Sequence, residues 1–275
     1  MLDFSHRSRA VSGPTCGSFG GVILLPLRRL YLSAGAPVGA GTPAIATASR
    51  HGREDERGTL RASNVTLGEL LWGEQVSARS EAYKFKITLR GITPAVWRRI
   101  EVPASYSLWD LHVAIQDAMG WQDYHLHAFR FKDPDRGGMI EVGIPDEDAF
   151  EDAPVVLPAW EQPMRVYFDR PDMRVEYQYD FGDSWEHDLL FEGIAPRVKG
   201  QKYPRCTGGA RACPPEDCGG VHRYERLLSV IFDPRDPEYE SMMTWLGGDF
   251  DPEAFDPAQV KFDNPRARWR RAFRN

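Results

Sequence analysis

The chain has 275 residues, of which 42% are hydrophobic and 27% charged, and its formal net charge is −6. This composition is typical of a folded globular protein and excludes collagen-like, coiled-coil and wholly unfolded chains. No stretch approaches the roughly 18 consecutive apolar residues of a membrane span, so we expect no membrane partner. Four cysteines are too few for a disulfide scaffold, which favours reduced thiols and a cytoplasmic protein.

The first 80 residues differ from the rest in charge. They contain no lysine, 9 arginines and 6 acidic residues, whereas residues 81–275 contain 25 basic and 34 acidic residues, a net charge of −9. Their apolar patches are too short to offset the entropy lost on ordering. We expect residues 1–80 to be a disordered extension rich in Gly, Ala and Arg, with a transit peptide and a misplaced start codon as alternatives. Residues 81–275 would form the folded domain.

The domain begins with a hairpin and a helix. Residues 83–89 alternate between apolar and polar positions, and residues 96–102 read as a second strand after a turn. Ser107 and Asp110 have the spacing of a capping box, and an apolar stripe continues from there to Gly120, which predicts a helix. Strands at 125–132 and 139–142 follow. This order of strand, strand, helix, strand, strand is typical of a ubiquitin-like roll.

The second half of the domain predicts another hairpin and several helices. Residues 144–164 contain four prolines and several acids and indicate an exposed loop, followed by a short strand at 165–168. Period-two alternation on both sides of Gly182-Asp183 predicts a hairpin over 175–191. We expect a compact single α+β domain with a mixed or antiparallel sheet and C-terminal helices. These helices are predicted at 224–232, 239–246 and 266–274.

Three stretches concentrate chemically unusual residues: WQDYHLHAFRF at 121–131, YDFGDSWEH at 179–187 and CTGGARACPPEDCGGVH at 206–222. His125 and His127 would share one face of a strand, because side chains repeat every two residues. An imidazole that faces inward must either hydrogen-bond or bind a cation. Hydrogen-bonded core histidines are the alternative to a divalent metal site, for which zinc is favoured over iron or manganese. The candidate metal ligands are His125, His127, Asp183 and His187, with Asp180 as a further carboxylate.

The cysteine-rich stretch offers a second, weaker candidate for structural zinc. Its spacing is C-x6-C-x4-C-x3-H, which supplies three thiolates and one imidazole but differs from the usual C-x2-C knuckle. A metal-free structured loop and a redox-active or nucleophilic thiol are the alternatives, because proline and glycine pairs favour a tight loop. This set consists of Cys206, Cys213, Cys218 and His222.

Further residues are candidates for acid-base chemistry or ligand contact. The candidate catalytic carboxylates are Asp180, Asp183, Glu216 and Asp217. The candidate ligand face consists of His112, Trp185, Gly182, Gly219 and Gly220. A basic patch at residues 266–274 can contact phosphate or an acidic partner, although the acidic core disfavours nucleic acid.

Several separate motifs resemble one known family. They are YKFKITLRGITPAVWRRI at 83–100, LHVAIQDAMGW at 111–121, YDFGDSWEH at 179–187, ACPPEDCGG at 212–220 and WLGGDFDPEAFD at 245–256. Through these motifs residues 83–273 resemble the Ri-plasmid ORF-three-like family, also labelled TnpR-type passenger proteins of insertion elements. The resemblance implies a compact α+β domain found in plasmids, mobile elements and bacterial chromosomes. It implies no biochemical activity.

The resemblance also marks signature positions. The TnpR label suggests a resolvase, but neither the nucleophilic serine nor the basic DNA-binding domain of a serine recombinase is evident in this sequence. The family's signature positions correspond to His112, His125, His127, Asp180, Gly182, Asp183, Trp185, His187, Pro214, Pro215, Glu216, Asp217, Gly219 and Gly220.

Three functional hypotheses follow. The first is an accessory or binding protein of a plasmid or mobile element, which recognises a protein or a small ligand through the face around His125, His127 and Asp183. The second is a metal-dependent enzyme, such as a hydrolase, in which Glu216 or Asp217 acts as general base. The third is a DNA-linked accessory protein that uses residues 266–274. The sequence contains no G-x-S-x-G elbow, P-loop, dinucleotide fingerprint or H-E-x-x-H helix.

Overall fold

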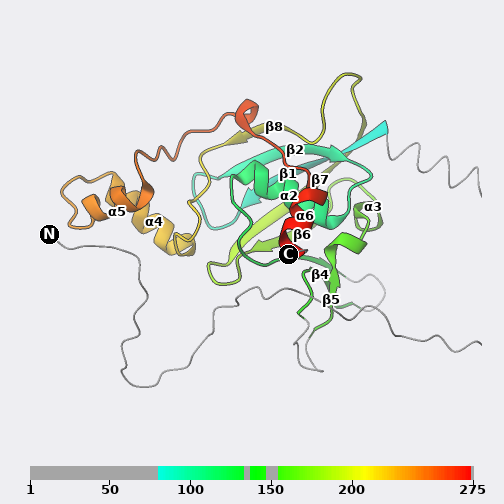
Figure 1. Ribbon diagram of the computed structural model, residues 1–275, viewed down its shortest axis with the longest axis horizontal. Helices are drawn as coiled ribbons and strands as arrows, with labels where there is room; N and C mark the ends of the chain where they lie inside the picture. Colours follow the sequence, from blue (N-terminus) through cyan, green and yellow to red (C-terminus); the bar gives the residue numbers. More distant parts are fainter. Residues whose placement is uncertain (1–79, 133–136, 147–153, 274–275) are drawn as a thin grey trace, which may run out of the picture.

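The computed structural model describes residues 80–132, 137–146 and 154–273, which form an eight-stranded sheet with helices (Figure 1). The strand order is β5-β4-β3-β6-β7-β1-β2-β8, and every neighbouring pair is antiparallel except β4 and β5. The fold is therefore α+β with a mixed sheet, as predicted. The strands are β1 (Glu81–Leu89), β2 (Trp97–Pro103), β3 (His127–Lys132), β4 (Met139–Gly143), β5 (Val156–Pro158), β6 (Arg174–Tyr179), β7 (Trp185–Pro196) and β8 (Arg205–Ala210).

The helices fall into two groups. In Figure 1, α2 and α6 lie over the sheet, whereas α4 and α5 project from one side of it. Among the described residues, no helix has the length and apolar character needed to cross a membrane. The helices are α2 (Leu108–Met119), α3 (Met164–Tyr167), α4 (Gly220–Ile231), α5 (Tyr239–Leu246) and α6 (Pro265–Phe273), with short 3-10 turns η1 (Ala159–Glu161) and η2 (Pro257–Gln259).

The predicted order of strand, strand, helix, strand, strand is present, but the two pairs of strands are not neighbours. The hairpin of β6 and β7 lies between them, because β7 pairs with β1 and β6 pairs with β3. This central position explains why apolar residues alternate so regularly in the hairpin. Its inward side chains are buried from end to end, including Tyr177, Leu189 and Phe191.

Helix α2 covers the sheet and has well-formed ends. Ser107 accepts a hydrogen bond from the backbone of Asp110, whose carboxylate in turn accepts one from the Ser107 backbone at 3.0 Å. The helix ends at Gly120, whose φ of 95° is readily adopted by glycine. Its apolar stripe, which includes Leu111 and Ile115, is fully buried. Burial of such side chains contributes roughly 1.5–3 kcal/mol each, so packing rather than helix propensity holds α2 in place.

Two predicted segments differ in the structure. The strand predicted at 165–168 is wrong, because this segment forms α3, a single helical turn that follows Pro163. The loop predicted at 144–164 is wrong in part: residues 147–153 lie outside the described residues, but β5 and η1 follow them. The cause is tertiary, since Leu108 N donates to Gln162 O at 2.9 Å and thereby ties this segment to the start of α2.

The predicted extension falls almost wholly on residues 1–79, which lie outside the described residues. That part of the domain division stays a prediction. The helices predicted at 224–232, 239–246 and 266–274 correspond to α4, α5 and α6, with bounds that differ by a few residues at most.

Arg98 is a buried charge without a carboxylate partner among the described residues. It is 1% exposed, and its guanidinium donates to the carbonyl oxygens of Ala118 at 2.8 Å and Ala210 at 2.9 Å. Its charge also lies over the ring of Phe255, 3.7 Å from the ring centre. Burial lowers the pKa of this guanidinium. Arg98 therefore joins β2, α2, the end of β8 and the segment after α5.

His187 is a fully buried histidine in β7. Its Nδ1 lies 3.2 Å from the carbonyl oxygen of Tyr177, and its Nε2 has no partner among the described residues. Burial is the main reason that the pKa of His187 falls from 6.5 to about 4, while nearby Arg90 acts in the same direction. The imidazole is therefore neutral in the folded protein at neutral pH.

This burial predicts that His187 contributes a loss of stability as the pH falls from 6.5 toward 4. In that window the unfolded chain binds a proton at His187 and the folded chain does not, so protonation favours unfolding. The full loss is roughly 3 kcal/mol. Urea unfolding of the wild type and of His187→Leu at several pH values in this window measures it, and the variant should show a flatter dependence.

The matched control is His222→Leu, because the His222 side chain is 98% exposed. It should leave the pH dependence unchanged. An equally steep dependence in His187→Leu and wild type would contradict the assignment.

Candidate functional site

The site is built where the turn between β6 and β7 meets the segment that precedes α4. Asp180 begins the turn with φ of 55°, in the left-handed region that Asp tolerates better than most residues. Its Oδ1 accepts hydrogen bonds from the backbone of Gly182 at 2.9 Å and of Asp183 at 3.2 Å. The carboxylate of Asp180 is therefore fixed by its own turn.

The same turn is attached to the start of α4. Asp183 Oδ2 accepts a hydrogen bond from the backbone N–H of Gly219 at 2.8 Å. Gly220 has φ of 77°, and a Cβ atom at this position would lie 2.6 Å from the carbonyl oxygen of Asp183. Only glycine permits this approach. The motifs around 179–187 and 212–220 are thus one structural unit.

Aromatic side chains join a third segment to this unit. Trp121 donates from Nε1 to the carbonyl oxygen of Pro214 at 3.0 Å and stacks on the ring of Tyr179, with 5.0 Å between ring centres. The hydroxyl of Tyr179 donates to Glu216 Oε1 at 2.6 Å and accepts from the backbone of Tyr124 at 3.0 Å. The loop before β3 is therefore held against both other segments.

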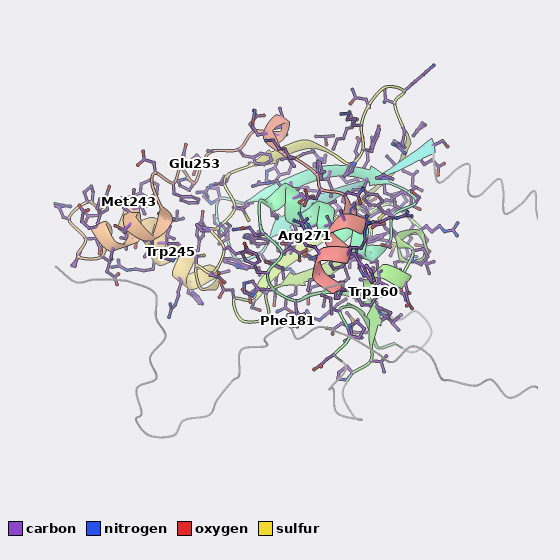
Figure 2. All side chains as sticks on the ribbon, viewed as in Figure 1. Trp160, Phe181, Met243, Trp245, Glu253 and Arg271 are labelled. Atoms are coloured by element: carbon purple, nitrogen blue, oxygen red, sulfur yellow. The ribbon has the colours of Figure 1, made fainter. Side chains whose placement is uncertain are left out.

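This arrangement brings His125, Asp180 and Asp217 together. His125 Nε2 lies 2.9 Å from Asp217 Oδ1 and 3.5 Å from Asp180 Oδ2. One ligand atom from each residue lies within 4.8 Å of the others, the only such group of His, Cys, Asp or Glu in the described part of the chain. The side chains of His125 and Asp217 are 32% and 65% exposed, so the group is open to solvent. Phe181, next to Asp180, is exposed on the surface near the start of α4 (Figure 2).

This group differs from the predicted metal set in three residues. His127 stacks on His112 with 3.4 Å between ring centres, and neither nitrogen of its ring has a partner among the described residues. His187 faces Tyr177, and Asp183 faces Gly219. Strand β3 begins at His127, so the expectation that His125 and His127 share one strand face is wrong. His125 instead lies in the preceding loop, which turns it toward Asp217.

The cysteine set is not assembled in the structure. Cys206 is fixed in β8, where it pairs with Ile100, and His222 points into solvent from α4. Burial raises the pKa of Cys218 to about 12 and raises that of Cys213 as well. Neither of these two thiols is poised as a thiolate, which disfavours the redox and nucleophilic alternatives. Their environment fits the metal-free structured loop.

Glu216 is the candidate carboxylate closest to the group in sequence. Burial raises its pKa, partly offset by the hydrogen bond from Tyr179. Its second oxygen, Oε2, is buried without a partner among the described residues. A hydrogen bond from the Gln122 backbone also offsets part of the rise in the pKa of Glu216, which is therefore held by both the loop before β3 and strand β6.

The residues of the predicted ligand face help to stabilise the fold, and two of them are buried in the core. Trp185 and His112 are at most 1% exposed and cannot form a contact surface. His112 is bound between Tyr177 and Asp123, at 2.8 Å from each. The glycines at 182, 219 and 220 shape the turn and its contact with α4. Sequence reasoning missed Tyr179 as the partner of Glu216, because the period-two pattern marks it only as a core residue.

The close approach at Gly220 generates a prediction. Gly220→Ala should lower the free energy of unfolding by roughly 2–4 kcal/mol, through backbone strain and the clash with Asp183. Chemical denaturation measures this loss.

Gly247→Ala is the matched control, because Gly247 has φ of 73° but open space around it. This variant isolates the strain and should lose only about 1 kcal/mol. Equal losses in the two variants would show that the contact with Asp183 contributes nothing.

Two proteins without an assigned function are similar to most of the described domain. The uncharacterized protein y4hQ of Sinorhizobium fredii is 34% identical over 194 residues, which cover 70% of this chain and 95% of that protein. A crystal structure of a protein of unknown function, MM3350 from Methanosarcina mazei, is 42% identical with a TM-score of 0.60. The match covers 66% of this chain and 99% of that one.

Residues 81–259 match the plasmid pRiA4b ORF-3-like proteins, and this range contains all three segments of the site. The resemblance inferred from the sequence is confirmed, and this chain belongs to the plasmid pRiA4b ORF-3-like protein family.

Proposed function

We propose that the protein is a binding protein that holds a divalent transition-metal ion through His125, Asp180 and Asp217. The observation that carries this proposal is the convergence of their ligand atoms within 4.8 Å of one another. One imidazole and two carboxylates suit zinc, iron or manganese. His125 and Asp217 share a proton in their short hydrogen bond, and a metal ion that binds between them displaces this proton.

The orientation of the ligands supports the proposal. Asp180 directs Oδ1 to the backbone of its own turn, which leaves Oδ2 facing His125. The edge of the His125 ring lies against Tyr179, with 5.8 Å between ring centres. Such outer contacts fix the direction of metal ligands and increase affinity. A preformed group of this kind needs little reorganisation when an ion binds.

The surroundings of the group favour ligand recognition. Three protein ligands leave coordination positions free for an outside molecule. Asp217 also lines a pocket of about 600 Å³ between α4 and α5, together with Arg223, Leu227, Met242 and Trp245. Figure 2 shows Trp245 on the projecting α5. The pocket therefore adjoins the metal group and offers both apolar and cationic contacts to a small ligand or a peptide.

This proposal predicts stoichiometric metal binding by the full chain. Titration calorimetry with Zn²⁺ and Mn²⁺, together with elemental analysis, should give about one ion per chain. His125→Ala, which removes a ligand, and Asp217→Asn, which removes the negative charge of a ligand, should each weaken binding at least about tenfold.

His222→Ala removes an exposed histidine outside the group and should bind metal as the wild type does. Metal binding that persists unchanged in His125→Ala and Asp217→Asn would contradict the proposal, as would its absence from the folded wild type.

A second candidate function, metal-dependent hydrolysis, is favoured by the position of Glu216. Its free, buried oxygen lies in the residue next to Asp217. A carboxylate so placed can accept the proton of a water molecule that attacks an ester or phosphoester bond.

Hydrolysis predicts a specific effect of Glu216→Gln. The variant should still bind metal but lose roughly 100-fold or more in turnover of p-nitrophenyl ester or phosphate substrates. The wild type loaded with metal is the reference. If the metal-loaded wild type shows no turnover, the hydrolase hypothesis is contradicted and the proposal of a metal-binding protein is unaffected.

A further inference from the structure

A second pocket shares no residue with the metal group. It has a volume of about 590 Å³ and lies between the start of α2, η1 and α6. Three tryptophans line it, Trp109, Trp160 and Trp269, together with Arg266 and Arg270. This volume is in the range of small-molecule sites.

The arginines of α6 fall into two sets with different partners. Arg268 binds Asp117 at 2.6 Å and Asp263 at 2.8 Å, and Arg271 lies 3.4 Å from Asp263. The ion pair with Asp117 holds α6 on α2, whereas the pairs with Asp263 join α6 to the segment that precedes it. Arg266 and Arg270 lie one helical turn apart and therefore on one face of α6.

The two guanidinium groups on that face form no direct ion pair with a carboxylate of the described residues, although burial raises the pKa of nearby Asp110 and the charge of Arg266 partly offsets this rise. Among the described residues, no carboxylate oxygen lies within 4.0 Å, the limit for an ion pair, of the guanidinium of Arg266 or Arg270. Arg270 Nε donates only to the carbonyl oxygen of Arg266. Two acids also line the pocket: Asp110, which accepts a hydrogen bond in the capping box of α2 and lies near the charge of Arg266, and Glu161, which is exposed to solvent. Two guanidinium groups are thus available to an anion.

Trp160 and Trp269 provide flat apolar surfaces beside these charges, whereas Trp109 is buried, with 3% of its surface exposed. Trp160 and Trp269 are only half-buried, and their rings pack edge to face with 6.2 Å between centres. Trp109 is held by a hydrogen bond from Nε1 to the Pro265 carbonyl at 3.2 Å. Figure 2 shows Trp160 next to α6. Fixed indole rings favour a planar ring as their partner.

We propose that this pocket binds a small ligand that joins a planar ring to an anionic group, as nucleoside monophosphates and aromatic carboxylates do. The guanidinium groups pair with the phosphate or carboxylate, and the ring packs on Trp160 and Trp269. A single small molecule fits better than a polynucleotide, because residues 81–275 carry a net charge of −9.

The first experiment defines the ligand chemistry. Calorimetric titration of the full chain with adenosine monophosphate and with indole-3-acetate is done with a chelator present, so that the metal group does not contribute. Adenosine and inorganic phosphate each carry half of the proposed chemistry. At least one of the two complete ligands should bind, and both halves should bind at least about tenfold more weakly.

Substitutions on α6 locate the ligand. Arg266→Gln and Arg270→Gln should each weaken binding at least about tenfold, whereas Arg271→Gln, which removes the same charge outside the pocket, should not. Circular dichroism verifies that the variants are folded. An equal effect of Arg271→Gln, equal binding of adenosine, or no binding of either complete ligand at millimolar concentration would overturn the proposal.

Discussion

The attachment of the β6–β7 turn to the start of α4 is the constraint on which the candidate metal group depends. Asp183 accepts from Gly219, and the absence of a side chain at Gly220 lets the two backbones approach. Asp180 lies on one side of this contact and Asp217 on the other. Their carboxylates meet His125 because the two segments cannot move independently. The close approach of the two backbone segments is therefore what brings the three side chains of the site together.

The sequence predicted those elements whose patterns are local. The hairpin of β6 and β7 and helix α5 were evident because their periodicity and their turn or cap residues lie within a few positions of each other. Helix α3 and strand β5 were not predicted. Their backbone is arranged by contacts with α2 and β4, which a local pattern does not contain. The central place of the β6–β7 hairpin in the sheet is likewise a property of distant pairing.

The site residues were predicted better than their grouping. His125, Asp180 and Asp217 all lie in stretches that the sequence singled out, but His125 and Asp217 are 92 residues apart. The start of β3 at His127 decided the outcome, since a strand that began two residues earlier would place both histidines on one face. Asp183 was a reasonable ligand by its chemistry. Its role at Gly219 follows from the turn geometry, which the residue type alone does not reveal.

The burial of Arg98 has a consequence for how the chain folds. Its guanidinium is enclosed only when β8 supplies the Ala210 carbonyl and Phe255 covers the charge, which joins positions more than half the domain apart. During synthesis, strand β2 leaves the ribosome long before Phe255 does. Until then the arginine keeps its water shell, and the core around β2 stays incomplete. Contacts of such long sequence separation slow folding, so the enclosure of Arg98 is completed only after the segment that carries Phe255 has been synthesised.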